Sequence, residues 1–137
     1  MQTTTQLRPW SVKRRWSAHF IRAMSILFLS FDASMKLLRL APAMEATIQL
    51  GYPAQAVMGI GMIELICLVL YSIPRTMILG AILLTGYLGG AVATHVRIES
   101  APFSVVFPVL LGMAVWGGVV LREPQLWALF WRSTARD

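Results

Sequence analysis

The sequence predicts an all-α polytopic membrane protein: a four-transmembrane-helix bundle with a short interfacial helix between the first and second spans. Hydrophobic residues make up 57% of the 137 residues and charged residues only 13%, whereas a soluble domain carries about a quarter charged residues. Four apolar stretches also have the length of about 20 residues with which a helix crosses hydrocarbon. These predicted spans are residues 16–38, 54–73, 77–96 and 103–121.

Turn-forming residues separate the four spans. Gly51 and Pro53 precede the second span, Pro74 and Arg75 divide the second from the third, and residues 100–102 connect the third to the fourth. The apolar runs do not alternate with polar residues, which argues against the strands of a membrane barrel. We therefore expect helices joined by short connections.

The segment 42–50 differs from the spans because it is short and amphipathic. Its leading proline suits the first turn of a helix, and Gly51 suits the position after a helix end. Met44 and Ile48 would contact the membrane surface while Glu45 faces water. This pattern predicts a short interfacial helix.

Basic residues flank the predicted spans unevenly, within a net charge of +6. One side of the bundle carries Arg8, Lys13, Arg14, Arg15, Arg22, Arg75, Arg122, Arg132 and Arg136, and the other carries Lys36, Arg39 and Arg97. Tryptophans expected at the membrane interface flank the richer side: Trp10, Trp16, Trp127 and Trp131. Because Lys and Arg favour the cytoplasm, we expect a multi-pass protein of the bacterial inner membrane with both termini cytoplasmic.

The chain then divides into a basic, loosely ordered N-terminal tail over 1–15, a transmembrane domain over 16–121 and a cytoplasmic tail over 122–137. Beside a hydrophobic span, such basic runs indicate contact with anionic lipid headgroups, and we expect no nucleic-acid partner.

Small residues predict close helix packing. Gly86 and Gly90 lie one helical turn apart in the third span, with Gly89 between them, and this spacing lets helices approach closely. The same role is expected of Gly59, Gly61, Gly112, Gly117 and Gly118. Such glycine faces also favour a homo-oligomer.

The single cysteine, Cys67, lies in an apolar segment. One cysteine forms no internal disulfide, which argues against enzymes that need cysteine pairs. We expect Cys67 to be a small buried apolar residue.

A few ionisable residues lie inside the predicted spans, where they are costly and need a partner or a watery cavity. Asp32 and Lys36 are spaced for an ion pair on one helix face. Glu64 lies in the second span, and His95 and Arg97 end the third. With 1.5 Å of rise per residue, all five fall in the outer half of the bundle, which predicts one polar site.

Two roles for this site remain open. In the structural role Asp32 pairs with Lys36, a proton or Arg97 neutralises Glu64, and the set fixes helix register. In the functional role the cluster binds a ligand or moves protons, with Glu64 and His95 as the exchanging groups.

Metal and haem binding are not predicted. Asp32, Glu64 and His95 are chemically suitable ligands, but no helix carries a paired ligand motif such as HxxxH or ExxH. His19 and His95 lie near opposite ends of the bundle, too far apart to hold one haem.

Several runs together resemble a known family: 31–32, 35–38, 45–47, 49–53, 59–61, 64–65, 73–76 and, most specifically, 86–97. They resemble the DoxX-like family of small bacterial membrane proteins, over about residues 25–121. The resemblance implies a compact four-helix membrane bundle. Relatives include a subunit of an archaeal thiosulfate:quinone oxidoreductase, bacterial proteins linked to redox complexes, and distant animal assembly chaperones. No flavin, haem or iron–sulfur motif is present, so a redox centre would come from a partner or a bound quinone.

The expected function is a membrane accessory or binding module for a quinone or lipid, or for a redox partner. Its candidate ligand-binding residues are Asp32, Lys36, Glu64, Tyr87, His95 and Arg97. Lys36 and Arg97 would donate hydrogen bonds to a quinone carbonyl or an anionic head. The alternatives are a small oxidoreductase or isomerase with Glu64 and His95 as acid and base, and a membrane-protein assembly factor. No catalytic residue is assigned.

Overall fold

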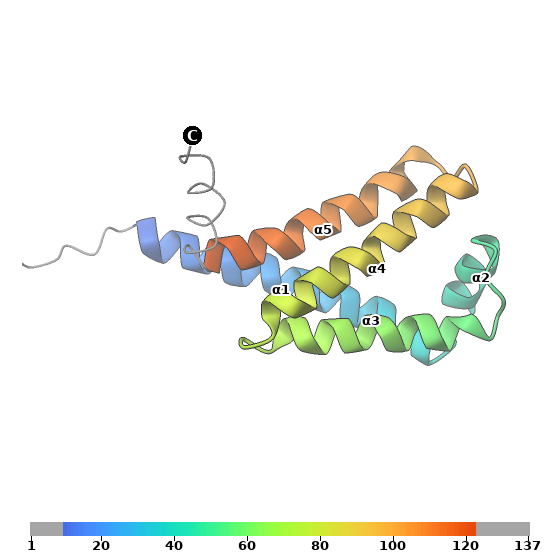
Figure 1. Ribbon diagram of the computed structural model, residues 1–137, viewed down its shortest axis with the longest axis horizontal. Helices are drawn as coiled ribbons and strands as arrows, with labels where there is room; N and C mark the ends of the chain where they lie inside the picture. Colours follow the sequence, from blue (N-terminus) through green and yellow to red (C-terminus); the bar gives the residue numbers. More distant parts are fainter. Residues whose placement is uncertain (1–9, 123–137) are drawn as a thin grey trace, which may run out of the picture.

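Residues 10–122 are the part of the chain that the computed structural model describes, with side chains from residue 15 onward, and within them the regular elements are all helices (Figure 1). They are α1 Trp10–Leu37, α2 Ala41–Gln49, α3 Ala56–Ser72, α4 Met77–Arg97 and α5 Pro102–Arg122. The all-α fold class is therefore confirmed. Residues 1–9, residues 123–137 of the tail predicted over 122–137, and the side chains of Trp10, Trp127 and Trp131 lie outside the described residues.

The observed helices follow the predicted elements, with one notable difference. α1 begins at Trp10 and runs for 28 residues, so it includes part of the segment expected to be loosely ordered. Lys and Arg are good helix formers, and no glycine or proline follows Pro9 within the first helix. α2 has a proline in its first turn, and Gly51, which follows the end of this helix, has a positive φ of 85°. Both features agree with the helix predicted from this proline and this glycine.

The four long helices form a ring. The backbone of α1 lies close to those of α3 and α5, and the backbone of α4 lies close to the same two helices, whereas among the described residues only side chains reach across the diagonals. α2 contacts α1 and α3 but neither α4 nor α5. Figure 1 shows α2 at one end of the molecule, hereafter the α2 end, where α4 and α5 rise away from α3. The start of α1 and the end of α5 meet at the opposite end.

The core lies between α1, α3, α4 and α5. Its buried members are Leu29, Cys67, Leu68, Tyr71, Met77, Ala81, Leu84, Val115 and Val119. Cys67 is a buried free cysteine, as expected. The hydroxyl of Tyr71 donates to the carbonyl of Val115 over 3.0 Å, so the buried polar atom is satisfied and ties α3 to α5.

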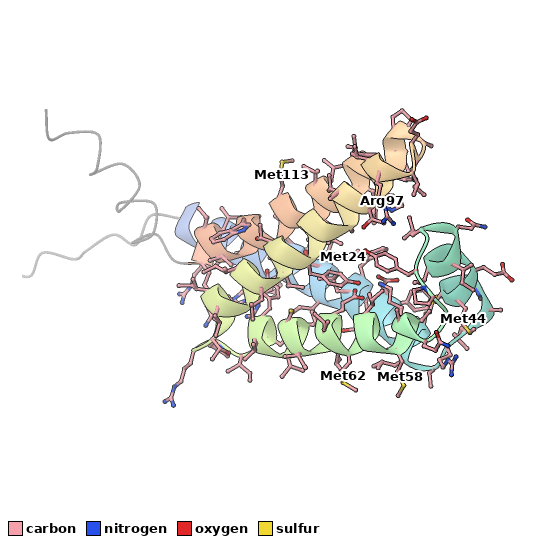
Figure 2. All side chains as sticks on the ribbon, turned by 45° about the vertical axis from the view of Figure 1, so that its right-hand side comes forward. Met24, Met44, Met58, Met62, Arg97 and Met113 are labelled. Carbon is pink, nitrogen blue, oxygen red and sulfur yellow. The ribbon has the colours of Figure 1, made fainter. Side chains whose placement is uncertain are left out.

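The outer surface of the helices is rich in apolar side chains. Ile63, Ile66 and Val69 of α3 are exposed, and Figure 2 shows Met58 and Met62 pointing away from the other helices. α4 and α5 are long and apolar enough to cross a membrane, and α3 is a shorter apolar helix. An apolar exterior of this extent fits a lipid environment better than water.

The predicted glycine packing holds at only some positions. A Cβ on Gly61 would lie 2.7 Å from the Cβ of Lys36, so this glycine does permit the close approach of α1 and α3. Nothing lies within 4 Å of a Cβ built at Gly59, Gly86, Gly89, Gly90 or Gly117. The prediction of close packing at Gly86 and Gly90 is therefore wrong, because α4 rises away from α3 near the α2 end (Figure 1).

Gly80 is where α4 approaches α3 most tightly, since its Cβ would overlap the backbone of Tyr71. We expect Gly80→Ala to lower the free energy of unfolding by about 1–3 kcal/mol, because backbone cannot move aside as a flexible side chain does. Thermal unfolding in one detergent measures this effect. Gly89→Ala on the same helix is the control and should be neutral or slightly stabilising; equal losses in both variants would contradict the prediction.

Candidate ligand site

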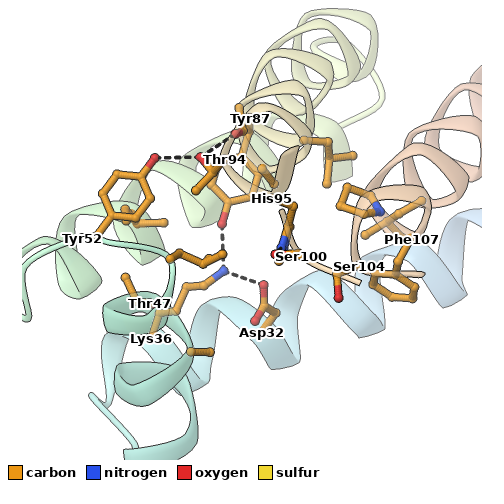
Figure 3. Close-up of a pocket in the computed structure, with 18 of the residues that line it drawn as sticks. Asp32, Lys36, Thr47, Tyr52, Tyr87, Thr94, His95, Ser100, Ser104 and Phe107 are labelled. Carbon is orange, nitrogen blue, oxygen red and sulfur yellow. Dashed lines mark hydrogen bonds and ion pairs between the residues drawn. The ribbon is translucent and has the colours of Figure 1, made fainter. Parts of the chain in front are cut away.

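A cavity of about 650 Å³ opens at the α2 end, a volume typical of small-molecule sites. Side chains from all five helices line it. Phe28, Phe107 and Leu111 supply part of an apolar wall, while Asp32 and Tyr87 lie on a polar wall (Figure 3). The cavity exists because α2 contacts α1 and α3 but not the diverging ends of α4 and α5.

Lys36 is the centre of the polar wall. Its Nζ donates to Asp32 Oδ2 at 2.5 Å, to Glu64 Oε2 at 2.8 Å and to Tyr87 Oη at 2.8 Å. The Tyr87 hydroxyl in turn donates to Glu64 Oε2 at 2.8 Å. An ammonium group has three hydrogens, so Lys36 has no donor left. We call Asp32, Lys36, Glu64 and Tyr87 the Lys36 cluster; it joins α1, α3 and α4.

The local sequence explains how the Lys36 cluster forms. Asp32 and Lys36 are one turn apart on α1 and pair along one face. On α3, Gly61 and Glu64 share a face, and the missing side chain at Gly61 lets α1 come close enough for Lys36 to reach Glu64. Tyr87 closes the cluster from α4.

The three charged members of the cluster differ in burial. Glu64 is fully buried and does not line the cavity, the Lys36 side chain is 14% exposed, and the Asp32 side chain is 39% exposed. Glu64 Oε1 is buried without a hydrogen-bond partner. With both carboxyls ionised, the cluster carries one negative charge in excess. The carboxylate of Asp32 is thus the charged acceptor that faces the cavity.

Further polar groups line the cavity away from the Lys36 cluster. The hydroxyls of Tyr52 and Thr94 lie 3.0 Å apart, and Thr94 itself donates to the carbonyl of Gly90, so Tyr52 is the donor between them. Pro108, inside α5, lacks the N–H that would bond the carbonyl of Ser104. Both residues line the cavity.

Sequence reasoning did not identify Tyr52, Thr94 or Ser104 as site residues. Thr94 follows Tyr87 by two helical turns, so their shared helix face was a signal that could have found it. Tyr52 lies in the connection after α2, and no helical spacing predicts where such a side chain points.

The structure brings four of the six predicted site residues into one hydrogen-bonded cluster and separates the other two from it. His95 lines the same cavity, and its Nδ1 lies 2.9 Å from the hydroxyl of Ser100. Arg97 does not line the cavity; its Nη2 donates to the carbonyl of Leu50 at 2.9 Å. The cation beside Glu64 is therefore Lys36. Among residues 10–122, no three His, Cys, Asp or Glu side chains are grouped to hold a metal ion.

An all-helical fold with apolar outer faces and a buried ion cluster defines a helical membrane protein with a ligand-sized cavity. Residues 20–118 match the DoxX-like family, so the chain belongs to this membrane-associated family, as its motifs predict. The match covers every residue of the Lys36 cluster. No curated protein matches the chain, and no solved structure does.

Proposed function

We propose that the protein crosses the bacterial inner membrane four times, through α1, α3, α4 and α5, with both termini cytoplasmic. Three observations support four spans. The long helices lie in one ring. The shortest of them, α3, has 17 residues and measures about 25 Å, close to the thickness of hydrocarbon. The charged residues Lys36 and Arg22 of α1 form hydrogen bonds with neighbouring helices. Partnered charges of this kind are those that a span tolerates.

Within this arrangement, we propose that the protein is a binding module for a hydrophobic ligand with a polar head. One observation carries the proposal: a cavity with an apolar wall also exposes the carboxylate of Asp32. A partly exposed carboxylate beside apolar side chains suits an amphipathic molecule whose tail contacts Phe28 and Phe107 and whose head reaches Asp32.

The hydrogen bonding also indicates the chemistry of the head. Lys36 has used its three hydrogens and Arg97 lies outside the cavity, so neither is free to donate to a quinone carbonyl as first expected. The carboxylate of Asp32 is an acceptor on the cavity wall. A head that donates hydrogen bonds, such as a quinol or a hydroxyl- or amine-bearing lipid, is complementary to it.

Filling the cavity tests this function. Gly86 and Gly90 line the cavity, and a Cβ added at either residue would meet no atom within 4 Å. We expect Gly86→Leu and Gly90→Leu to lower the amount of co-purifying lipid or quinol about tenfold, because the added side chain overlaps the ligand. The protein is extracted in a mild detergent, and bound small molecules are quantified by mass spectrometry.

Gly89→Leu is the matched control, since Gly89 also has open space but does not line the cavity. It should retain the ligand at the level of the unmodified protein. If the unmodified protein carries no stoichiometric small molecule, or if all three variants lose it equally, the binding function is rejected and a protein partner becomes the better explanation.

The other candidate functions receive less support from the geometry. An oxidoreductase or isomerase with Glu64 and His95 as acid and base would need both groups at the substrate, yet only His95 lines the cavity. Docking of a redox partner, assembly of other membrane proteins and homo-oligomerisation would use the outer surface, and no described contact favours one of them.

A further inference from the structure

A second, smaller cavity of about 300 Å³ lies at the opposite end from α2, between α1 and α5. Its lining residues are Arg15, Ala18, His19 and Arg22 of α1 and Gly118 and Arg122 of α5. The four α1 residues follow helical spacing and share one face, and the two α5 residues are one turn apart. Three guanidinium groups and one imidazole therefore converge, and no acidic residue is among the lining side chains. We call this the arginine pocket.

Arg22 is held in place by the end of α3. Its Nη2 donates to the carbonyls of Tyr71 at 3.1 Å and Ser72 at 2.5 Å, at a helix end where carbonyls lack partners within the helix. The guanidinium also lies 5.7 Å from the centre of the Tyr71 ring. These contacts fix the orientation of the group before any ligand arrives.

The fixed guanidinium keeps an unused donor. Arg22 Nε is buried and has no hydrogen-bond partner. Gly118 lets α5 pack closely against Arg22, since a Cβ there would lie 3.3 Å from the Cβ of Arg22 and 2.9 Å from the Tyr71 hydroxyl. A buried N–H without a partner is costly, so the hydrogen-bonding capacity of this guanidinium is not fully used.

The charged residues that line the arginine pocket are all basic. Arg122 lies close enough to Arg22 for their positive charges to repel each other. Gathering like charges around one space is unfavourable unless an anion occupies it. Guanidinium groups bind phosphate oxygens through paired N–H donors, and three of them suit a group with several oxygens.

We propose that the arginine pocket binds a phosphate group, carried either by the head of an anionic lipid or by a soluble phosphate. This site is separate from the Lys36 cluster, and the proposal does not depend on the function of the larger cavity. The phosphate oxygens accept from the guanidinium groups that line the pocket, and Arg15, Arg22 and Arg122 together neutralise the charge.

Native mass spectrometry of the full-length protein tests the proposal. The detergent-solubilised protein is titrated with phosphatidylglycerol, and with phosphatidylcholine as the lipid without net charge. We expect Arg122→Gln to weaken phosphatidylglycerol binding about tenfold, the effect of losing a charge-assisted hydrogen bond. Arg15→Gln should act in the same direction. Both variants leave the contacts of Arg22 with α3 intact, so folding is preserved.

Arg75→Gln is the matched control, because Arg75 is an exposed arginine in the connection between α3 and α4 and does not line the pocket. It removes the same charge and should leave binding unchanged. Addition of inorganic phosphate distinguishes the sources: competition indicates a soluble phosphate, and retention of the lipid indicates a headgroup. Equal weakening by Arg122→Gln and Arg75→Gln, or none in either, would overturn the proposal.

Discussion

Lys36→Met is expected to lower the free energy of unfolding by about 3–5 kcal/mol, the cost of leaving buried charge without its partner. The substitution keeps a long apolar side chain but removes the three hydrogen bonds of the ammonium group. It leaves Glu64 and Asp32, two carboxyls, without the cation between them. Unfolding followed by circular dichroism in one mild detergent measures the change.

Two further variants distinguish the loss of the Lys36 ion pairs from nonspecific destabilisation of the protein. In the double variant Lys36→Met with Glu64→Leu, both buried charges are gone, so the loss should be smaller than the sum of the single losses. Arg39→Met removes an exposed positive charge three residues beyond Lys36 and should have little effect. Strict additivity in the double variant would show that the pair is not energetically coupled.

Asp32→Asn is expected to weaken binding of a short-chain benzoquinol by about tenfold to a hundredfold, with a much smaller effect on stability. The carboxylate is the charged acceptor facing the cavity, and hydrogen bonds to charged groups contribute about 1.5–3 kcal/mol. Lys36 keeps Glu64 and Tyr87 as partners in this variant. Calorimetric titration of the detergent-solubilised protein gives the dissociation constants.

The oxidised benzoquinone provides the chemical control, since it accepts hydrogen bonds but does not donate them. The unmodified protein should bind it more weakly than the quinol, and Asp32→Asn should reduce that difference. Glu45→Gln, at an exposed carboxyl of α2, should not change either constant. Tighter binding of the quinone, or unchanged quinol binding in Asp32→Asn, would refute the assignment of Asp32 as the acceptor.

Local sequence signals predicted the elements of the fold well. The short helix α2 follows from its leading proline and the glycine after it, and the connections follow from Pro53, Pro74 and Pro102. The start of α1 was misplaced because polar, basic composition was taken as a sign of loose order. Such composition is also compatible with a helix that extends beyond the apolar stretch.

The candidate site was predicted in part. The pairing of Asp32 with Lys36 depends only on helical spacing, and the depth of Glu64 depends only on the rise per residue. The partner of Glu64 was left open between a proton and Arg97, whereas the structure gives Lys36. Tyr52, in a connection, was not predicted as a site residue at all.

Composition, helical spacing and turn residues determined the helical class and the Asp32–Lys36 pair, and the resemblance of several motif runs indicated the family. Only the tertiary structure decided which glycines pack and which open a cavity: Gly61 and Gly80 admit neighbouring helices, while Gly86 and Gly90 face open space. It also decided that Arg97 bonds to Leu50 rather than to the buried carboxyl. The physical reason is that these outcomes depend on how each helix is rotated and where two helices diverge, which the packing of all the helices together sets.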